Sequence, residues 1–144
     1  MKKIIITLAI AFSSVIAFAG EVNVSSNILN SFGRDFAGAT GVQWTTGNKL
    51  AKASFVFNGQ HVIAFYNLDG ELMGITRNIT SLDLPLYLQT SLKKDYQDYW
   101  ISDLFELSND NGTSYYITLQ NADGSVVLKS SEVKWTVYKK YSKA

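Results

Sequence analysis

The chain has 144 residues, no cysteine, and 13 Lys and Arg side chains against 12 Asp and Glu. This near-balance of charge gives no support for nucleic-acid binding, which relies on an excess of basic side chains. The lack of cysteine excludes disulfides, thiolate catalysis, thiolate metal sites and lipid attachment to a cysteine.

The first 19 residues have the three parts of a secretory signal peptide. Residues 1–3 (Met-Lys-Lys) are basic, residues 4–16 are largely apolar, and residues 17–19 (Ala-Phe-Ala) form a small-x-small cleavage site. The apolar run is shorter than the roughly 20 residues that a membrane anchor needs. We therefore expect a periplasmic or extracellular protein that begins at Gly20 and keeps no membrane anchor after cleavage. The remaining chain is long enough for one domain, held by its core alone.

The first half of the exported chain predicts a helix followed by four strands. Ser25 begins a run of helix-capping residue types, and apolar residues then recur at helical spacing up to Phe36. The predicted strands are 42–45, 50–57, 61–66 and 71–78. Residues 50–57 alternate between apolar and polar side chains, which is typical of a half-buried antiparallel strand. Asn58-Gly59 is a strong hairpin signal, because both residue types accept a positive φ.

The second half predicts the same order of elements. Leu84-Pro85 begins a helix, for which Ser81 and Asp83 are candidate caps. Leu84, Leu88, Leu92 and Tyr96 form one apolar stripe along it. The predicted strands are 99–107, 114–120, 125–129 and 132–138. In the last strand, Trp135 is expected to face one way and Tyr138 the other.

A ten-residue pattern occurs twice, at 64–73 and at 118–127, with the turn Asn-x-Asp-Gly in both copies. Such a repeat indicates one unit used twice. We predict an α+β fold: a duplicated helix-plus-four-strand antiparallel unit, with repeats at about 25–79 and 81–141 in a single domain of residues 20–144. The units would pair edge to edge into one curved sheet with both helices on one face, which hides one strand edge per unit.

The residues that most enzymatic sites require are scarce. His61 is the only histidine, and no Gly-x-Ser-x-Gly sequence accompanies it. The chain offers too few ligands for a zinc site, and the turn at 109–112 lacks the later glutamate of a calcium loop. Asp69 and Asp123 have a local role in turns, where aspartate tolerates a left-handed backbone and caps itself. We therefore expect no enzyme activity, no metal and no cofactor.

Aromatic side chains are the remaining functional signal. Tyr66, Tyr116 and Tyr138 are candidates for an exposed face of the sheet, because each alternates away from apolar neighbours. Tyrosine is enriched at binding hot spots. The alternative is that these rings cover the second unit or pack across strands.

Several short sequences occur in an order that is characteristic of one family. They are Phe36 with the strand Val42-x-Trp44, Ala53-x-Phe55, Asn58-Gly59, Phe65-Tyr66-x-x-Asp69-Gly70, Leu84-Pro85, Tyr96, and Tyr115-Tyr116 before Asp123-Gly124. In this order they resemble the small exported proteins of Bacteroidota-type bacteria called beta-lactamase-inhibitor-like, or PepSY-like, proteins. One departure is Ala37, where members often have proline.

The resemblance implies the duplicated fold, a periplasmic or extracellular location and no known catalytic residues. It also implies binding to other proteins, since related PepSY domains are thought to restrain peptidases; this is an analogy from fold. The leading hypothesis is a non-enzymatic exported module that recognises a protein partner, such as an exported hydrolase, through the sheet face. The alternatives are an inhibitor of a peptidase or other hydrolase, and an envelope small-molecule or stress sensor with its ligand between helix and sheet. The sequence indicates neither the partner nor the oligomeric state.

Overall fold

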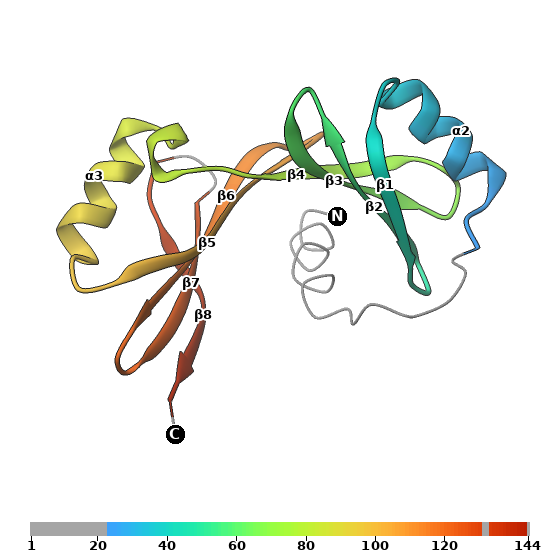
Figure 1. Cartoon of the computed structure of the whole chain (residues 1–144). Helices are drawn as coiled ribbons and strands as arrows, with labels where there is room; N and C mark the ends of the chain where they lie inside the picture. Colours follow the sequence, from blue (N-terminus) through green and yellow to red (C-terminus); the bar gives the residue numbers. More distant parts are fainter. Residues whose placement is uncertain (1–22, 131–132, 144) are drawn as a thin grey trace. The chain divides into compact units, whose positions relative to one another are not determined.

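The computed structural model describes residues 23–130 and 133–143, so the signal peptide predicted over residues 1–19 lies outside the described residues. In chain order the elements are α2 (Ser26–Asp35), β1 (Thr40–Thr46), β2 (Leu50–Phe57), β3 (Gln60–Asn67), β4 (Leu72–Asn78), the 3-10 helix η1 (Ser81–Asp83), α3 (Leu86–Asp95), β5 (Trp100–Asn109), β6 (Gly112–Asn121), β7 (Gly124–Ser130) and β8 (Thr136–Ser142) (Figure 1).

The strands form one eight-stranded sheet in which they lie in chain order from β1 to β8. The pairs β1–β2, β2–β3, β3–β4, β6–β7 and β7–β8 are antiparallel. The α+β class is therefore confirmed, and the order of one helix and four strands occurs twice. The position of both helices on one face and the origin of the two halves by duplication stay predictions.

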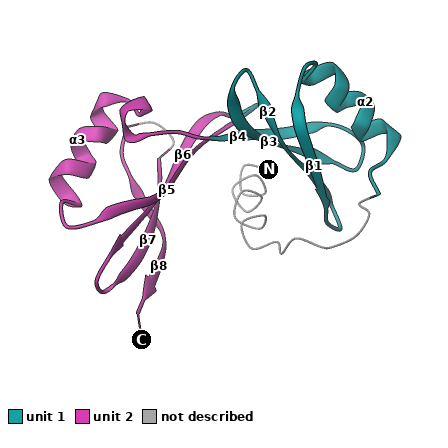
Figure 2. Ribbon diagram, viewed as in Figure 1, with its two compact units in different colours: residues 1–77, 109–111 teal, residues 78–108, 112–144 magenta. Residues whose placement is uncertain are grey.

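The chain divides into two compact units (Figure 2). Unit 1 contains the described residues up to Arg77 together with residues 109–111. Unit 2 contains 78–108 and the described residues from Gly112 onward. Each unit has its own helix and its own hydrophobic core.

In unit 1, α2 packs on one face of β1, β2 and β3. The hydroxyl of Ser25 caps the helix by accepting a hydrogen bond from the backbone N–H of Ile28 at 3.4 Å, as the sequence predicted. Ile28 and Phe36 are buried against the inward side chains of the sheet. The buried residues of this core are Ile28, Phe36, Ala51, Ala53, Phe55, Val62, Ala64 and Tyr66.

The β2–β3 hairpin has the predicted turn. Asn58 has φ 52° and Gly59 has φ 79°. Positive φ at both positions matches the twist of the flanking strands. The register of the pair then places Phe55 opposite Val62 and Ala53 opposite Ala64, all facing α2.

In unit 2, α3 packs on the sheet through the predicted leucine stripe. The buried residues of this second core are Leu84, Leu88, Leu92, Leu104, Ile117, Leu119, Val126 and Leu128. The indole Nε1–H of Trp135 donates to the backbone carbonyl of Leu88 at 3.1 Å, which joins the segment before β8 to the helix.

Two local predictions in unit 2 are wrong. Neither Ser81 nor Asp83 caps α3, whose N-cap is Pro85. The Asp83 carboxylate instead accepts the backbone N–H of Thr80 at 2.9 Å and so closes η1. The last strand begins at Thr136 rather than at 132, a position outside the described residues, because the side chain of Trp135 is directed to α3.

The two Asn-x-Asp-Gly turns are held by asparagine rather than by the aspartate that the sequence analysis favoured. The Asn67 side-chain oxygen accepts from the N–H groups of Asp69 and Glu71 at 3.0 and 2.9 Å. The Asn121 oxygen accepts from Asp123 and Gly124 at 2.9 and 3.0 Å. Both are Asx turns, in which a side chain replaces a backbone acceptor.

The strands before these two turns differ in which of their residues face the helix. Tyr66, directly before Asn67, belongs to the core beneath α2. In the other copy Leu119, two residues before Asn121, belongs to the core beneath α3. A register shift between Phe65 and Tyr66 accompanies this difference. The two copies therefore share turn chemistry but do not superpose residue by residue.

Candidate binding surfaces

Tyr66 is buried in the core of unit 1, so the expectation that it is exposed is wrong. Its side chain has 0% exposure, and its hydroxyl donates to the Asp35 carboxylate at 2.9 Å. Burial raises the pKa of the Tyr66 phenol, and the hydrogen bond to Asp35 raises it further. Ala64 and Tyr66 face α2, while Phe65 between them faces the other way. The ring is a structural tie between β3 and the end of α2.

Tyr116 lies on the sheet face away from α3, but it is also buried. Its neighbours Ile117 and Tyr115 pack with the α3 core, so the alternation of β6 turns Tyr116 to the opposite side. The ring stacks on Phe105 with centroids 5.1 Å apart. Burial, followed by the neighbouring Tyr138, raises the pKa of Tyr116 to about 12. Its buried hydroxyl has no hydrogen-bond partner among the described residues.

Tyr138 is half-buried and meets the Tyr116 ring edge-on, with centroids 5.9 Å apart. The Lys129 ammonium lies 5.9 Å from the centre of the Tyr116 ring. We call Phe105, Tyr116, Lys129 and Tyr138 the sheet-face cluster. The structure thus brings together two of the three predicted tyrosines, whereas Tyr66 belongs to the core of unit 1.

Ser54 and His61 form a hydrogen-bonded pair between β2 and β3 in unit 1. The Ser54 hydroxyl and His61 Nε2 are 2.8 Å apart. The pair joins neighbouring strands diagonally, since Ser54 lies opposite Ile63 and His61 opposite Val56. Among the described residues, no carboxylate is hydrogen-bonded to the imidazole, and a catalytic triad uses such a group to orient its base. Nor do these residues contain a cluster of three metal-ligating side chains.

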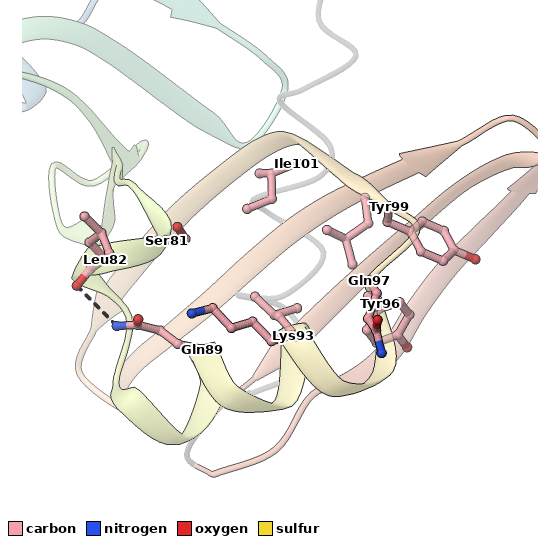
Figure 3. A pocket seen from close by; sticks show the side chains of 10 residues that line it. Ser81, Leu82, Gln89, Lys93, Tyr96, Gln97, Tyr99 and Ile101 are labelled. Carbon is pink, nitrogen blue, oxygen red and sulfur yellow. Dashed lines mark hydrogen bonds between the residues drawn. The ribbon is translucent and has the colours of Figure 1, made fainter.

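A groove lies between α3, η1 and the start of β5, with a volume of about 270 Å³. Figure 3 shows Gln89 and Lys93 on α3 and Ile101 on β5 around the same opening. The Gln89 side chain donates to the backbone carbonyls of Leu82 and Leu84 at 3.3 and 2.8 Å, which fixes η1 against the helix. The lining residues are Ser81, Leu82, Gln89, Leu92, Lys93, Tyr96, Gln97, Tyr99, Ile101 and Leu119.

Two large apolar side chains that line this groove are exposed, and so is a third on the neighbouring turn of α3. Leu82 is 81% exposed, Leu86 78% and Ile101 43%. Leu86 precedes Gln89 by three residues on α3, which places both on the same side of the helix. We call Leu82, Leu86 and Ile101 the apolar rim. Sequence reasoning missed it, although Leu86 falls outside the leucine stripe and so carried a readable signal.

A second, more polar hollow of about 200 Å³ adjoins the groove, because Tyr99 lines both. Its other lining residues are Asn121, Asp123, Gly124, Ser125, Val126, Lys140, Tyr141 and Ser142. The two hollows differ in charge. Lys93 is the one charged side chain among the residues that line the groove, whereas the polar hollow has both Asp123 and Lys140.

None of the helices within the described ranges is long and apolar enough to cross a membrane.

Three solved structures share the fold at low sequence identity. A BLIP-like protein from Bacteroides fragilis NCTC 9343 is 17% identical with a TM-score of 0.74, covering 87% of this chain and 92% of that chain. A proposed periplasmic protein from Bacteroides eggerthii DSM 20697 is 13% identical with a TM-score of 0.74, covering 84% and 90%. A DUF2874 family protein from Bacteroides ovatus ATCC 8483 is 14% identical with a TM-score of 0.74, covering 85% and 89%.

No family model and no curated protein matches the sequence. At these identities the similarity shows the fold alone. The chain therefore has the fold of BLIP-like and DUF2874 proteins, which confirms the fold part of the resemblance. The link to PepSY-like proteins stays a prediction.

Proposed function

We propose that this protein is a non-enzymatic exported module that recognises a protein partner. The apolar rim is the observation that carries the proposal: Leu82 and Ile101 line the groove, Leu86 lies on the same side of α3 as the lining residue Gln89, and all three are exposed. Exposed apolar patches with polar borders are typical of protein-interaction sites. Export is supported by the signal sequence and by the similarity to a proposed periplasmic protein.

The non-enzymatic part of the proposal is supported by the geometry of the surface. Ser54 and His61 form a nucleophile–base pair without an orienting carboxylate among the described residues. The groove contributes a single ionisable lysine together with tyrosine, amide and aliphatic side chains. These groups can bind and orient a ligand, but they do not form a catalytic set of nucleophile, base and oxyanion donor.

The sheet face is a second region for partner contact within the same proposal. Phe105 and Tyr138 offer half-exposed rings there, and Lys129 adds a cation beside them. Tyr116 would support these rings from beneath rather than touch the partner. Tyr66 no longer belongs to this surface, because it is buried under α2.

The test is affinity capture from the periplasm and medium of the native organism, using the exported chain and three variants. The triple replacement Leu82→Ser, Leu86→Ser and Ile101→Ser should lose the partner, while Tyr138→Ser reports on the sheet face. Leu68→Ser is the matched control, because Leu68 is 53% exposed but lies in unit 1. Equal capture by the triple variant and the control would contradict the assignment to the rim.

In the inhibitor form of the proposal, the partner is a peptidase or other hydrolase that the chain inhibits. The enzyme's activity should then fall in proportion to added chain and reach its minimum at a fixed stoichiometry. The triple rim variant should inhibit less than the Leu68→Ser control. An enzyme that is captured but keeps its full activity would contradict the inhibitor form of the proposal.

A small-molecule sensor is the second candidate, and the groove favours it. A volume of about 270 Å³ is close to the lower end of ligand pockets. A ligand at 100 times its Kd should stabilise the folded chain by about 2.7 kcal/mol. A thermal-shift screen with envelope metabolites tests this candidate, and Leu92→Ala serves as the variant that alters the groove floor.

A further inference from the structure

The lining of the groove combines an apolar floor with one cation. Leu92 and Leu119 are buried and close the bottom, and Ile101 forms one side. Lys93 adds the only charge among the lining residues, and its ammonium group makes no hydrogen bond or ion pair with another described residue. Complementary chemistry is therefore an apolar group with a negative charge beside it.

The apolar rim extends beyond the space that a small ligand would fill. A molecule of about 270 Å³ occupies the groove but leaves much of Leu82 and Leu86 in water, since these side chains are 81% and 78% exposed. A protein segment that runs across the opening covers the rim as well as the groove. The rim thus favours a macromolecular occupant over a compact small molecule.

The adjoining polar hollow indicates the direction in which a bound peptide segment would run. Tyr99 is the shared wall, so a chain that passes over this ring reaches both the groove and the hollow with Asn121 and Lys140. An extended peptide advances about 3.3 Å per residue, so a few residues reach from one hollow into the next. Alternate side chains can then enter the groove while backbone groups meet the polar hollow.

We infer that the groove takes an extended peptide segment of the partner that places a large apolar side chain over Leu92 and a carboxylate beside Lys93. This inference rests on the proposed function, because it assigns partner chemistry to the same rim. The carboxylate is an Asp or Glu next to the apolar residue in the segment. The Lys93 ammonium selects for it by charge, and the leucine floor selects for the apolar neighbour.

The experiment is a selection of displayed random heptapeptides on the exported chain. Enriched sequences should pair Leu, Ile, Phe or Trp with Asp or Glu, and they should not be retained by the Leu86→Asp/Ile101→Asp double variant. The inference is overturned if no peptide is enriched, if the enriched peptides lack a carboxylate, or if the double variant binds them equally. Circular dichroism confirms that the variant is folded.

Two lysines on α3 supply a matched pair for the affinity measurement. Lys93 lines the groove, and the adjacent exposed Lys94 does not. For an enriched peptide, Lys93→Met should weaken binding about fivefold, as expected for an exposed ion pair, while Lys94→Met leaves it unchanged. Equal effects of both replacements would overturn the role of Lys93. The two proposals can be distinguished. If a protein partner is captured in a rim-dependent way but the peptide selection fails, the proposed function is kept and this inference is rejected.

Discussion

Tyr66 and Tyr116 are both buried, but only the hydroxyl of Tyr66 has a hydrogen-bond partner among the described residues. We predict that Tyr66→Phe lowers the free energy of unfolding by about 1 kcal/mol, because the bond to Asp35 is lost. Tyr116→Phe should cost nothing or stabilise the fold, since it removes a buried polar atom without a partner. Urea unfolding of both variants measures the difference. An equal loss of unfolding free energy in the two variants would contradict this prediction.

The same two phenols predict a loss of stability at alkaline pH. Burial is the main cause of the raised pKa at both, with the folded value at about 12 for Tyr116. An unfolded tyrosine ionises near pH 10, so the folded chain holds these protons more tightly. Their stabilising contribution is complete below about pH 10 and is lost as the pH rises through the folded values. Absorbance at 295 nm and unfolding at several pH values test this, and Tyr116→Phe should show a shallower fall.

At the scale of single residues, the sequence correctly predicts the features that depend only on neighbouring residues in the chain. Ser25 as a helix cap and Asn58-Gly59 as a hairpin are confirmed, because each needs only its own neighbours. The exposure of Tyr66 was predicted wrongly, since β3 has buried side chains on both faces and the packing of α2 covers the face of Tyr66. The groove was missed because Leu82, Lys93 and Ile101 come from three separate elements.

At the scale of elements, we predict that alanine stabilises the fold at one glycine and destabilises it at two others. Gly33→Ala should stabilise α2 by about 1 kcal/mol, because the helix is open around that position. Gly70→Ala should destabilise the fold by about 1–3 kcal/mol, since Gly70 has φ +87° and its new Cβ would lie 3.0 Å from the Asn27 carbonyl. Gly124→Ala should also destabilise, because the Cβ would overlap the Tyr141 carbonyl and displace β8. Thermal unfolding of the three variants checks the order.

A stable Gly124→Ala variant would contradict the close approach of β7 and β8 at Tyr141. Gly33→Ala is the control, because it shows that an alanine side chain by itself does not destabilise the fold.

The elements themselves could be predicted because hydrophobic period and turn residues agree. The strand Leu50–Phe57 has the expected bounds, and its alternation reports directly on burial. The start of β8 could not be placed in this way. Trp135 continues the alternation of the strand but turns its indole to the Leu88 carbonyl on α3, a contact 47 residues away in the chain.

At the scale of the whole molecule, the strand order leaves β1 and β8 at the two ends of the sheet. Lys139 and Lys140 lie exposed on β8. Charged side chains on an edge strand oppose pairing with another molecule. We predict that Lys139→Thr/Lys140→Thr increases self-association, as measured by sedimentation velocity over a concentration series. Lys93→Thr/Lys94→Thr removes the same charge from α3 and should leave the sedimentation coefficient unchanged. A monomeric β8 variant at all concentrations would contradict the role of these lysines.

The class of the fold was readable from the sequence, because eight short strands and two helices each carry their own pattern. The ten-residue repeat also led to the correct order of elements. It could not show that different residues of the two copies face the helix. The same Asn-x-Asp-Gly turn can follow a strand whose last residue faces either side of the sheet. Tyr66 and Leu119 occupy the cores at different distances from their turns.

The three tryptophans lie in different parts of the molecule, so they can serve as intrinsic fluorescent probes of those parts. Trp44 lies among the rings of the unit 1 core, 5.2 Å from Phe32 between centroids. The indole of Trp135 is hydrogen-bonded to α3 in unit 2, and Trp100 is 53% exposed at the start of β5. Single-tryptophan versions would therefore emit from one core, from the other core or from the exposed start of β5. Intrinsic fluorescence can then follow the melting of each half without any attached dye.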